Sequence, residues 1–203
     1  MKYLLFLFLL FIAGCKNNSG SRQQIQEAKT ATRIIYIQPL GVVSSQYINT
    51  VKASVEQFYG FKCEIRKAIP LTKDILANSK KRYEASKILR KFNSKENIFL
   101  LMEKDIAWKD TAHKSDEYGI IGLGNRPGTV CVVSTHRLKR NASEQKVMER
   151  LEKTALHEIG HNLGLSHCDK TPKCMMNDEK GTIQTTDNEL VYLCPACRKN
   201  IGI

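Results

Sequence analysis

Three stretches in the N-terminal half of the chain carry the hydrophobic pattern of β-strands. Residues 33–40 form a continuous apolar run with a β-branched bias, which predicts a buried strand, and residues 97–102 form a second apolar run. Residues 61–66 alternate between apolar and charged side chains. This alternation predicts a strand with one buried face.

Helical spacing of apolar residues appears between and after these runs. A helix is expected to begin at Ser44 or Ser45, whose hydroxyl can cap it. The residues on its buried face are Ile48, Val51, Val55 and Phe58. A second helix is predicted over 80–92, with a basic face that we interpret as solvated surface. A third is predicted to begin at Asn141, where Glu144 completes a capping box.

Two further β-rich runs lie within residues 118–138. The sequence Asn-Arg-Pro-Gly at 125–128 separates them and predicts a turn. A last helix is expected over 186–193. Because strands alternate with helices along the chain, we predict an α/β domain in which much of the sheet is parallel.

The chemistry is concentrated in one stretch, which reads His-Glu-Ile-Gly-His-Asn-Leu-Gly-Leu-Ser-His. His157 and His161 are four residues apart, so on a helix their imidazoles face the same way and can bind one metal ion. Gly164 can end the helix in a left-handed conformation and return the chain so that His167 becomes a third ligand. Three neutral ligands leave zinc one position for water, and Glu158 is placed to take the proton of that water.

Two histidines at this spacing are common on helices that bind no metal. The longer pattern is more specific, because three of the five histidines in the chain fall within it together with the glutamate and the glycine. His113 and His136 have no partner motif and are expected to be ordinary surface or core residues.

Four cysteines follow the third histidine. Cys168 comes directly after it, then Cys174, and Cys194 and Cys197 form a Cys-x-x-Cys pair. This arrangement resembles the archaemetzincins, a family of metzincin metallopeptidases in which a cysteine tetrad holds a structural zinc. The resemblance implies that Met176 is the methionine of the Met-turn. In the family four residues separate the first two cysteines, whereas five do here, which affects the local geometry of the loop.

The resemblance also implies a fold and a mode of substrate binding. The fold is a metzincin-like three-layer domain with a twisted, mixed, mostly parallel sheet, a backing helix, a long active-site helix and a small cysteine-rich C-terminal part. One edge strand of metzincins pairs antiparallel with an extended peptide. The similarity of the 118–138 stretch to the family's edge hairpin assigns that role to residues 118–123.

The four cysteines also predict a zinc site without reference to the resemblance. Four thiolates form a closed tetrahedral zinc site without room for water, and the alternative is a pair of disulfides. Cys63 and Cys131 remain outside it, and they either pair with each other or stay as buried thiols.

The N-terminus carries an export signal. Residues 1–14 combine Lys2 with an apolar run that is too short for a permanent membrane span. The sequence before Cys15 resembles a bacterial lipobox, which implies cleavage before Cys15, its acylation, and a membrane-anchored protein on the periplasmic or cell-surface side. A plain secretion signal is the alternative. Residues 16–32 then form a flexible tether, and 33–203 form one peptidase domain.

Composition restricts the partners. The formal net charge is +12, which suits anionic lipid or acidic partners. A zinc ribbon that binds nucleic acid is disfavoured by the predicted export, and a monomer is expected. We therefore predict a peptidase that holds two zinc ions per chain, acts on peptides or proteins and has an N-terminal lipid anchor. The alternative is a non-catalytic zinc-containing scaffold with the same fold, and the intact Glu158 argues against it.

Overall fold

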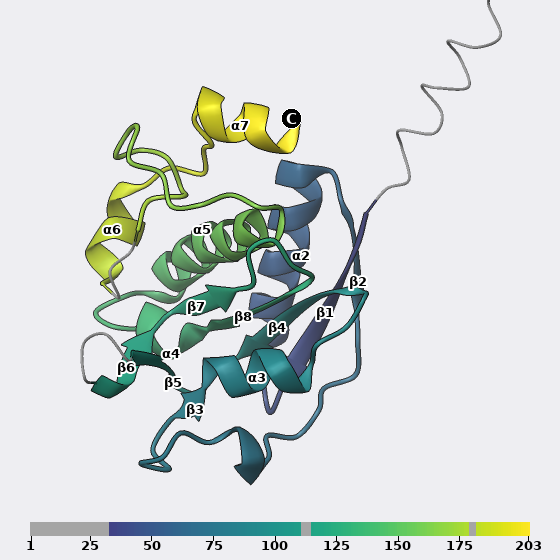
Figure 1. Cartoon of the computed structure of the whole chain (residues 1–203), viewed down its shortest axis with the longest axis vertical. Coiled ribbons are helices and arrows are strands. Elements are labelled where there is room, and N and C mark those ends of the chain that lie inside the picture. The colour runs from purple at the N-terminus through teal and green to yellow at the C-terminus, as the bar shows by residue number, and fades with distance from the viewer. Residues whose placement is uncertain (1–32, 111–114, 179–181) are drawn as a thin grey trace, which may run out of the picture. The chain divides into compact units, whose positions relative to one another are not determined.

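The computed structural model describes residues 33–110, 115–178 and 182–203 (Figure 1). The predicted signal, the predicted lipidation site Cys15 and the predicted tether all lie outside these ranges, as does His113. Within the described residues, no helix is both long enough and apolar enough to cross a membrane.

The main sheet has five strands in the order β2-β1-β4-β8-β7. Their bounds are β1 (Ile34–Leu40), β2 (Lys62–Ile65), β4 (Asn97–Met102), β7 (Gly122–Gly124) and β8 (Val130–Ser134). The first three pairings along this order, which join β2, β1, β4 and β8, are parallel, and only β7 runs antiparallel to its neighbour β8. The mostly parallel sheet predicted from the sequence is confirmed.

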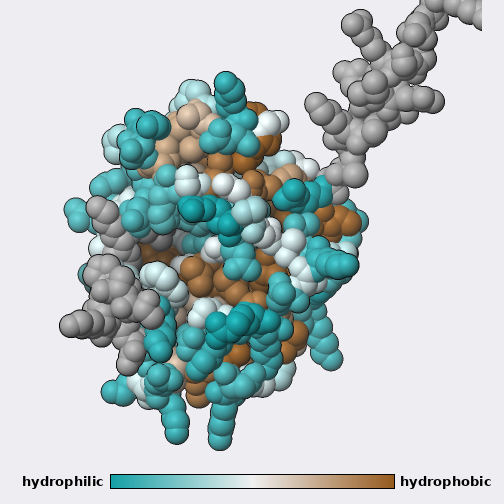
Figure 2. Space-filling view, viewed as in Figure 1, coloured by the Kyte–Doolittle hydropathy of each residue, from teal (hydrophilic) through white to brown (hydrophobic). Residues whose placement is uncertain are grey.

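Helices cover both faces of this sheet, which gives the three layers (Figure 1). The long helices α2 (Ser45–Tyr59) and α5 (Glu144–Asn162) share one apolar core with the sheet, and α3 (Ala85–Lys91) packs in a second core with residues from the other face. The basic residues of α3 lie on its outer side, as expected. Hydrophilic side chains cover much of the face seen in Figure 2, and apolar ones gather towards its middle.

A second, smaller sheet has the order β3-β5-β6. Its strands are β3 (Tyr83–Glu84), β5 (Ile106–Asp110) and β6 (Ser115–Ile120). Residues 118–123 were predicted to form one edge strand. This prediction is wrong, because the chain passes from one sheet to the other at Ile121. Strand β6 pairs with β5, and only Gly122–Gly124 forms the edge of the main sheet.

Several helix boundaries also differ from the sequence prediction. The helix expected over 80–92 begins only at Ala85, because Lys80 has a positive φ of 59° and Tyr83–Glu84 is a strand. The helix expected over 186–193 is α6 (Ile183–Asn188). The remaining short helices are η1 (Lys73–Ile75), α4 (Thr135–Leu138) and α7 (Pro195–Ile201).

The cap of α5 is Ser143 and not Asn141. The Ser143 hydroxyl accepts a hydrogen bond from the Lys146 backbone N–H at 3.3 Å, whereas Asn141 adopts a left-handed conformation with φ 48°. A serine hydroxyl satisfies one of the free N–H groups of the first turn as well as an asparagine would. The helix start therefore moves by two residues, and the placement of its C-terminal turns is unchanged.

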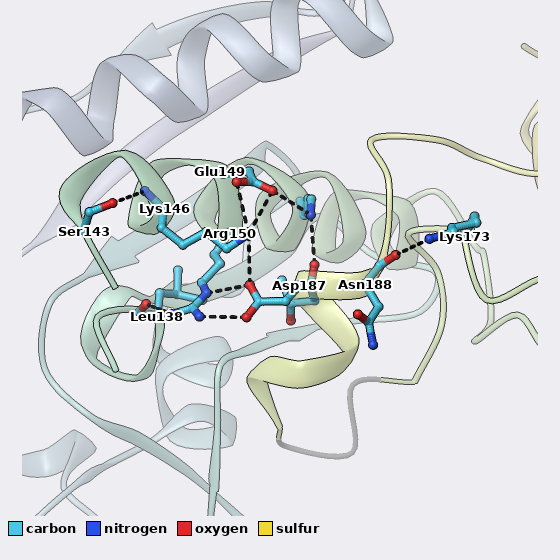
Figure 3. A network of polar contacts seen from close by, with 10 residues as sticks. Leu138, Ser143, Lys146, Glu149, Arg150, Lys173, Asp187 and Asn188 are labelled. Carbon is cyan, nitrogen blue, oxygen red and sulfur yellow. Dashed lines mark hydrogen bonds and ion pairs between the residues drawn. The ribbon is translucent and has the colours of Figure 1, made fainter. Parts of the chain in front are cut away.

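Arg150, which is buried on α5, connects this helix to α4 and α6 (Figure 3). Its guanidinium donates to both Asp187 carboxylate oxygens, at 2.7 and 2.8 Å, and to the backbone carbonyls of Leu138 and Arg140. The bond from Arg150 holds the pKa of Asp187 below its usual range. A buried charge with all these partners fixes the C-terminal segment against the middle of α5.

Cys63 and Cys131 do not pair. Cys63 lies on β2 and Cys131 on β8, and both β1 and β4 lie between these strands. Adjacent strands are about 4.8 Å apart, so the two cysteines are separated by far more than the Cα distance that a disulfide bridges. Both are buried free thiols.

Candidate active site and metal centres

His157, His161 and His167, the histidine triad, converge at the C-terminal end of α5. One ring nitrogen from each lies within 4.8 Å of the others, and the ring centroids are 4.6, 4.9 and 5.4 Å apart. His157 and His161 are buried, and His167 is exposed. The three sequence-predicted metal ligands therefore meet at one point.

The chain reaches His167 by the predicted reversal. Gly164 has φ 102°, a conformation that side chains other than glycine rarely adopt, and its N–H donates to the His161 carbonyl at 2.9 Å. The Leu165 N–H then bonds to the Gly160 carbonyl at 3.0 Å. Together these bonds close the helix and turn the chain back.

Two backbone carbonyls set the tautomers of the buried histidines. The Nδ1 of His157 lies 2.6 Å from the Met175 carbonyl, and the Nδ1 of His161 lies 2.7 Å from the Leu165 carbonyl. A carbonyl only accepts, so each Nδ1 carries the proton and each Nε2 presents its lone pair. Neither contact can be predicted from the sequence, because backbone groups leave no signature in a motif.

Electrostatics keep these imidazoles neutral. Burial, with the nearby His161 as a smaller cause, lowers the pKa of His157 to about 3. Burial also lowers the pKa of His161, and the neighbouring His167 and Arg126 act in the same direction. Neutral imidazole is the form that binds a metal, so the triad fits a zinc ion with three nitrogen ligands.

Glu158 lies buried beneath the edge strand β7. A Cβ built on Gly122 would be 2.3 Å from Glu158 Oε1, and one built on Gly124 would be 2.8 Å from the Glu158 carbonyl oxygen and 3.2 Å from His161 Cβ. Side chains at these positions would collide with the helix. The two glycines let β7 pass directly over the glutamate and the second histidine, a role that the Gly-Leu-Gly sequence alone did not reveal.

Cys168, Cys174, Cys194 and Cys197, the cysteine tetrad, form a second cluster. All four are buried free thiols, and their Sγ atoms lie within 4.8 Å of one another. The Sγ atoms of Cys168 and Cys194 are 3.6 Å apart and those of Cys174 and Cys197 are 3.9 Å apart. These separations far exceed the S–S bond of about 2.05 Å, and four thiolates suit a closed zinc site.

Backbone hydrogen bonds connect the tetrad to the triad. The Cys168 N–H donates to the Met176 carbonyl at 2.7 Å, and the Met175 N–H donates to the Tyr192 carbonyl at 2.9 Å. Met175 also accepts from His157. The loop that carries the first two cysteines thus supports the helix that carries the histidines.

Met176 is fully buried beneath α5, as expected for the Met-turn residue. A Cβ on Gly160 would be only 2.6 Å from its Sδ, so Gly160 is required for this close packing. Tyr59, which the sequence analysis did not single out, lies beside it and donates its hydroxyl to the Leu156 carbonyl at 2.8 Å. His136, by contrast, is exposed on α4 and takes no part in the triad.

The fold and the histidine triad define the class: the protein is a zinc-dependent metallopeptidase, with a long helix that presents the triad below the antiparallel edge of a mostly parallel sheet. Residues 46–202 match the description Peptidase family M54. The chain therefore belongs to this family, as the archaemetzincin resemblance predicted.

Relatives support the assignment. The chain is 26% identical over 176 residues to the archaemetzincin of Haloarcula marismortui, which covers 81% of this chain and 97% of the relative. Over 90 residues it is 37% identical to the archaemetzincin of Halobacterium salinarum, covering 40% of this chain and 51% of that protein.

Solved structures agree with the fold. The crystal structure of archaemetzincin from Archaeoglobus fulgidus, complexed with malonate, superimposes with a TM-score of 0.73 at 28% identity, covering 83% of this chain and 99% of that one. Archaemetzincin from Methanopyrus kandleri gives a TM-score of 0.69 at 20% identity and covers 86% of this chain and 98% of its own.

Proposed function

We propose that His157, His161 and His167 bind a catalytic zinc ion and that Glu158 is the general base and later the proton donor of peptide hydrolysis. The observation that carries the proposal is the convergence of three imidazole nitrogens within 4.8 Å, next to a glutamate buried under β7. The carbonyls that hold two of the Nδ1 protons support it, because they direct Nε2 towards the ion.

When bound, zinc supplies the Lewis acidity that activates a water molecule and polarises a peptide carbonyl. Residues of the protein carry out proton transfer and hold the site in place. Glu158 accepts the proton of the attacking water and delivers it to the leaving amine, so that no covalent intermediate with the protein forms. The turn at Gly164 holds His167 in place, and the packing of Met176 on Gly160 keeps the last turns of α5 rigid.

The substrate is a peptide or protein. We infer that it binds as an extended strand along the free edge of β7, antiparallel to it, because β7 is the last strand in the sheet order and passes over Glu158. Backbone hydrogen bonds would then hold the scissile bond next to the triad.

The cysteine tetrad is proposed to hold a second, structural zinc ion, which gives two per chain. Four buried cysteine sulfurs that lie within 4.8 Å of one another suit such a site. In this proposal the ion fixes the loop that follows His167 and the start of α7, and the folded domain acts as a monomer.

Removal of zinc tests the proposed function. The purified full chain, in detergent, is expected to cleave members of a diverse peptide mixture, to lose this activity when a chelator strips the metal, and to regain it when zinc is restored. Mass spectrometry of the products identifies the cleaved bonds. Cleavage that persists in the metal-free protein, or none in a protein shown to hold its zinc, would contradict the proposal.

We also propose that the mature chain begins at Cys15 and is anchored by lipid on the exported side of a membrane, with 16–32 as a tether. Mass spectrometry of the N-terminal peptide is expected to show acyl groups on Cys15 in the native sequence and none in Cys15→Ala. Cys63→Ala, at a buried position in the domain, is expected to keep the lipid. An N-terminal peptide without acyl mass in the native chain would refute the anchor.

A further inference from the structure

The loop between β7 and β8 fixes Arg126 beside the histidine triad. The side-chain amide of Asn162, the last residue of α5, donates to the Asn125 carbonyl at 2.9 Å, and the Gly128 N–H donates back to the Asn162 carbonyl at 3.1 Å. Through these bonds Asn125 and Gly128, which lie on either side of Arg126, are held to Asn162, the residue that follows His161 on α5. The loop therefore has a defined position relative to the triad.

The Arg126 side chain is exposed. Its backbone lies beside the triad, because Asn125 and Gly128 are both hydrogen-bonded to Asn162, the residue after His161. Among the described residues, none forms an ion pair with its guanidinium. The acidic groups at the triad are Glu158, which is buried under β7, and Asp178, which lies 3.9 Å from His167. The guanidinium is thus available to a ligand.

The direction of β7 decides which part of a peptide meets this charge. Gly122 and Gly124 cross over Glu158, and the chain continues from Gly124 towards Arg126. In an antiparallel pair the two chains run in opposite directions. The residues of a bound peptide on the N-terminal side of the scissile bond therefore lie along the end of β7 and approach Arg126.

We propose that Arg126 is a specificity-determining residue that favours peptides with an acidic side chain among the first residues on the N-terminal side of the scissile bond. The inference deepens the proposed function and rests on it. An exposed ion pair contributes modestly, so the expected preference for glutamate over glutamine is about threefold, and it declines as ionic strength rises.

The test measures binding, so that it does not depend on turnover. The probes are N-acetylated peptides that end in a hydroxamate, a zinc-binding group that places all their residues on the N-terminal side. Pairs with Glu or Gln at each of the last three positions are titrated into the zinc-loaded full chain. The native protein is expected to bind at least one Glu peptide about threefold more tightly than its Gln partner.

Variants separate the contribution of Arg126 from the general positive charge of the protein. Arg126→Gln is expected to bring the ratio of dissociation constants to about one, and Arg126→Glu to bring it below one. Arg90→Gln is the matched control, because Arg90 lies on α3, which belongs to the other core, and its side chain is 68% exposed. This variant is expected to retain the native ratio.

Equal binding of all pairs by the native chain, or a preference that survives in Arg126→Gln, would overturn the inference. Absence of hydroxamate binding would overturn it together with the zinc site. A protein that shows the preference but cleaves no peptide would refute the proposed peptidase function and leave the ligand preference established.

Discussion

Replacing Glu158 with glutamine is expected to lower kcat for peptide hydrolysis by about a thousandfold, the usual contribution of a well-placed general acid and base. Glutamine has nearly the same shape, so it fits the space under Gly122 and Gly124 where Glu158 lies. It cannot accept the proton of the attacking water. The zinc content is expected to stay at the native level, because the three histidines are unchanged.

The measurement is kcat and KM on a peptide that the native protein cleaves, together with metal analysis of both proteins. Glu152→Gln is the matched control, because Glu152 lies on the same helix outside the triad and the same charge is removed. It is expected to retain native kinetics. A Glu158→Gln protein that holds zinc and turns over at the native rate would remove Glu158 from the mechanism.

The second large effect is expected at the cysteine tetrad. Cys194→Ala should reduce the zinc content from two ions to one and destabilise the domain by about 4 kcal/mol or more, as loss of a structural metal ligand does. For a domain of this size this corresponds to a fall in Tm of about 10 °C. The cause is that the tetrad joins the loop that carries Cys168 and Cys174 to the start of α7.

Cys63→Ala provides the comparison, because Cys63 is as buried as Cys194 but lies on β2, outside the tetrad. It should keep two zinc ions and lose little stability. Thermal unfolding and metal analysis measure both effects. If Cys194→Ala kept two ions, the second zinc would not be bound by the tetrad. If the native tetrad reacted with thiol reagents only after reduction, the structural zinc would be ruled out in favour of disulfides.

The histidine triad was predictable because its information is local. His157 and His161 lie one helical turn apart, and Gly164 supplies the conformation that returns His167. The same locality explains the prediction of the turn between β7 and β8. Each of these features depends on a few consecutive residues. Their relative positions are set by the local backbone conformation, with little influence from distant parts of the chain.

The surroundings of the triad were not predictable in the same way. The carbonyls of Met175 and Leu165 that orient the histidines are backbone groups, which every residue has. Gly122 and Gly124 acquire their importance only when β7 crosses α5, which is a tertiary contact. The position of Arg126 depends on Asn162 in the same manner.

The errors have a common physical origin. Asn141 and Ser143 are both good caps, and the three-dimensional path of the loop selects the second. The pattern over residues 118–123 is uniformly β-rich, so the change of sheet at Ile121 leaves no mark in the hydrophobic periodicity. The pairing of Cys63 with Cys131 is excluded only by the strand order, which is a property of the whole sheet.

We propose one zinc ion in an open nitrogen site beside Glu158 and another in a closed sulfur site. Anomalous diffraction from crystals of the native protein, recorded at the zinc absorption edge, tests it most directly. Two peaks per chain are expected, one at about 2.1 Å from nitrogens of His157, His161 and His167, and one at about 2.3 Å from the four sulfurs of the tetrad. Zinc at the tetrad alone, with the triad empty in zinc-supplemented crystals, would contradict it.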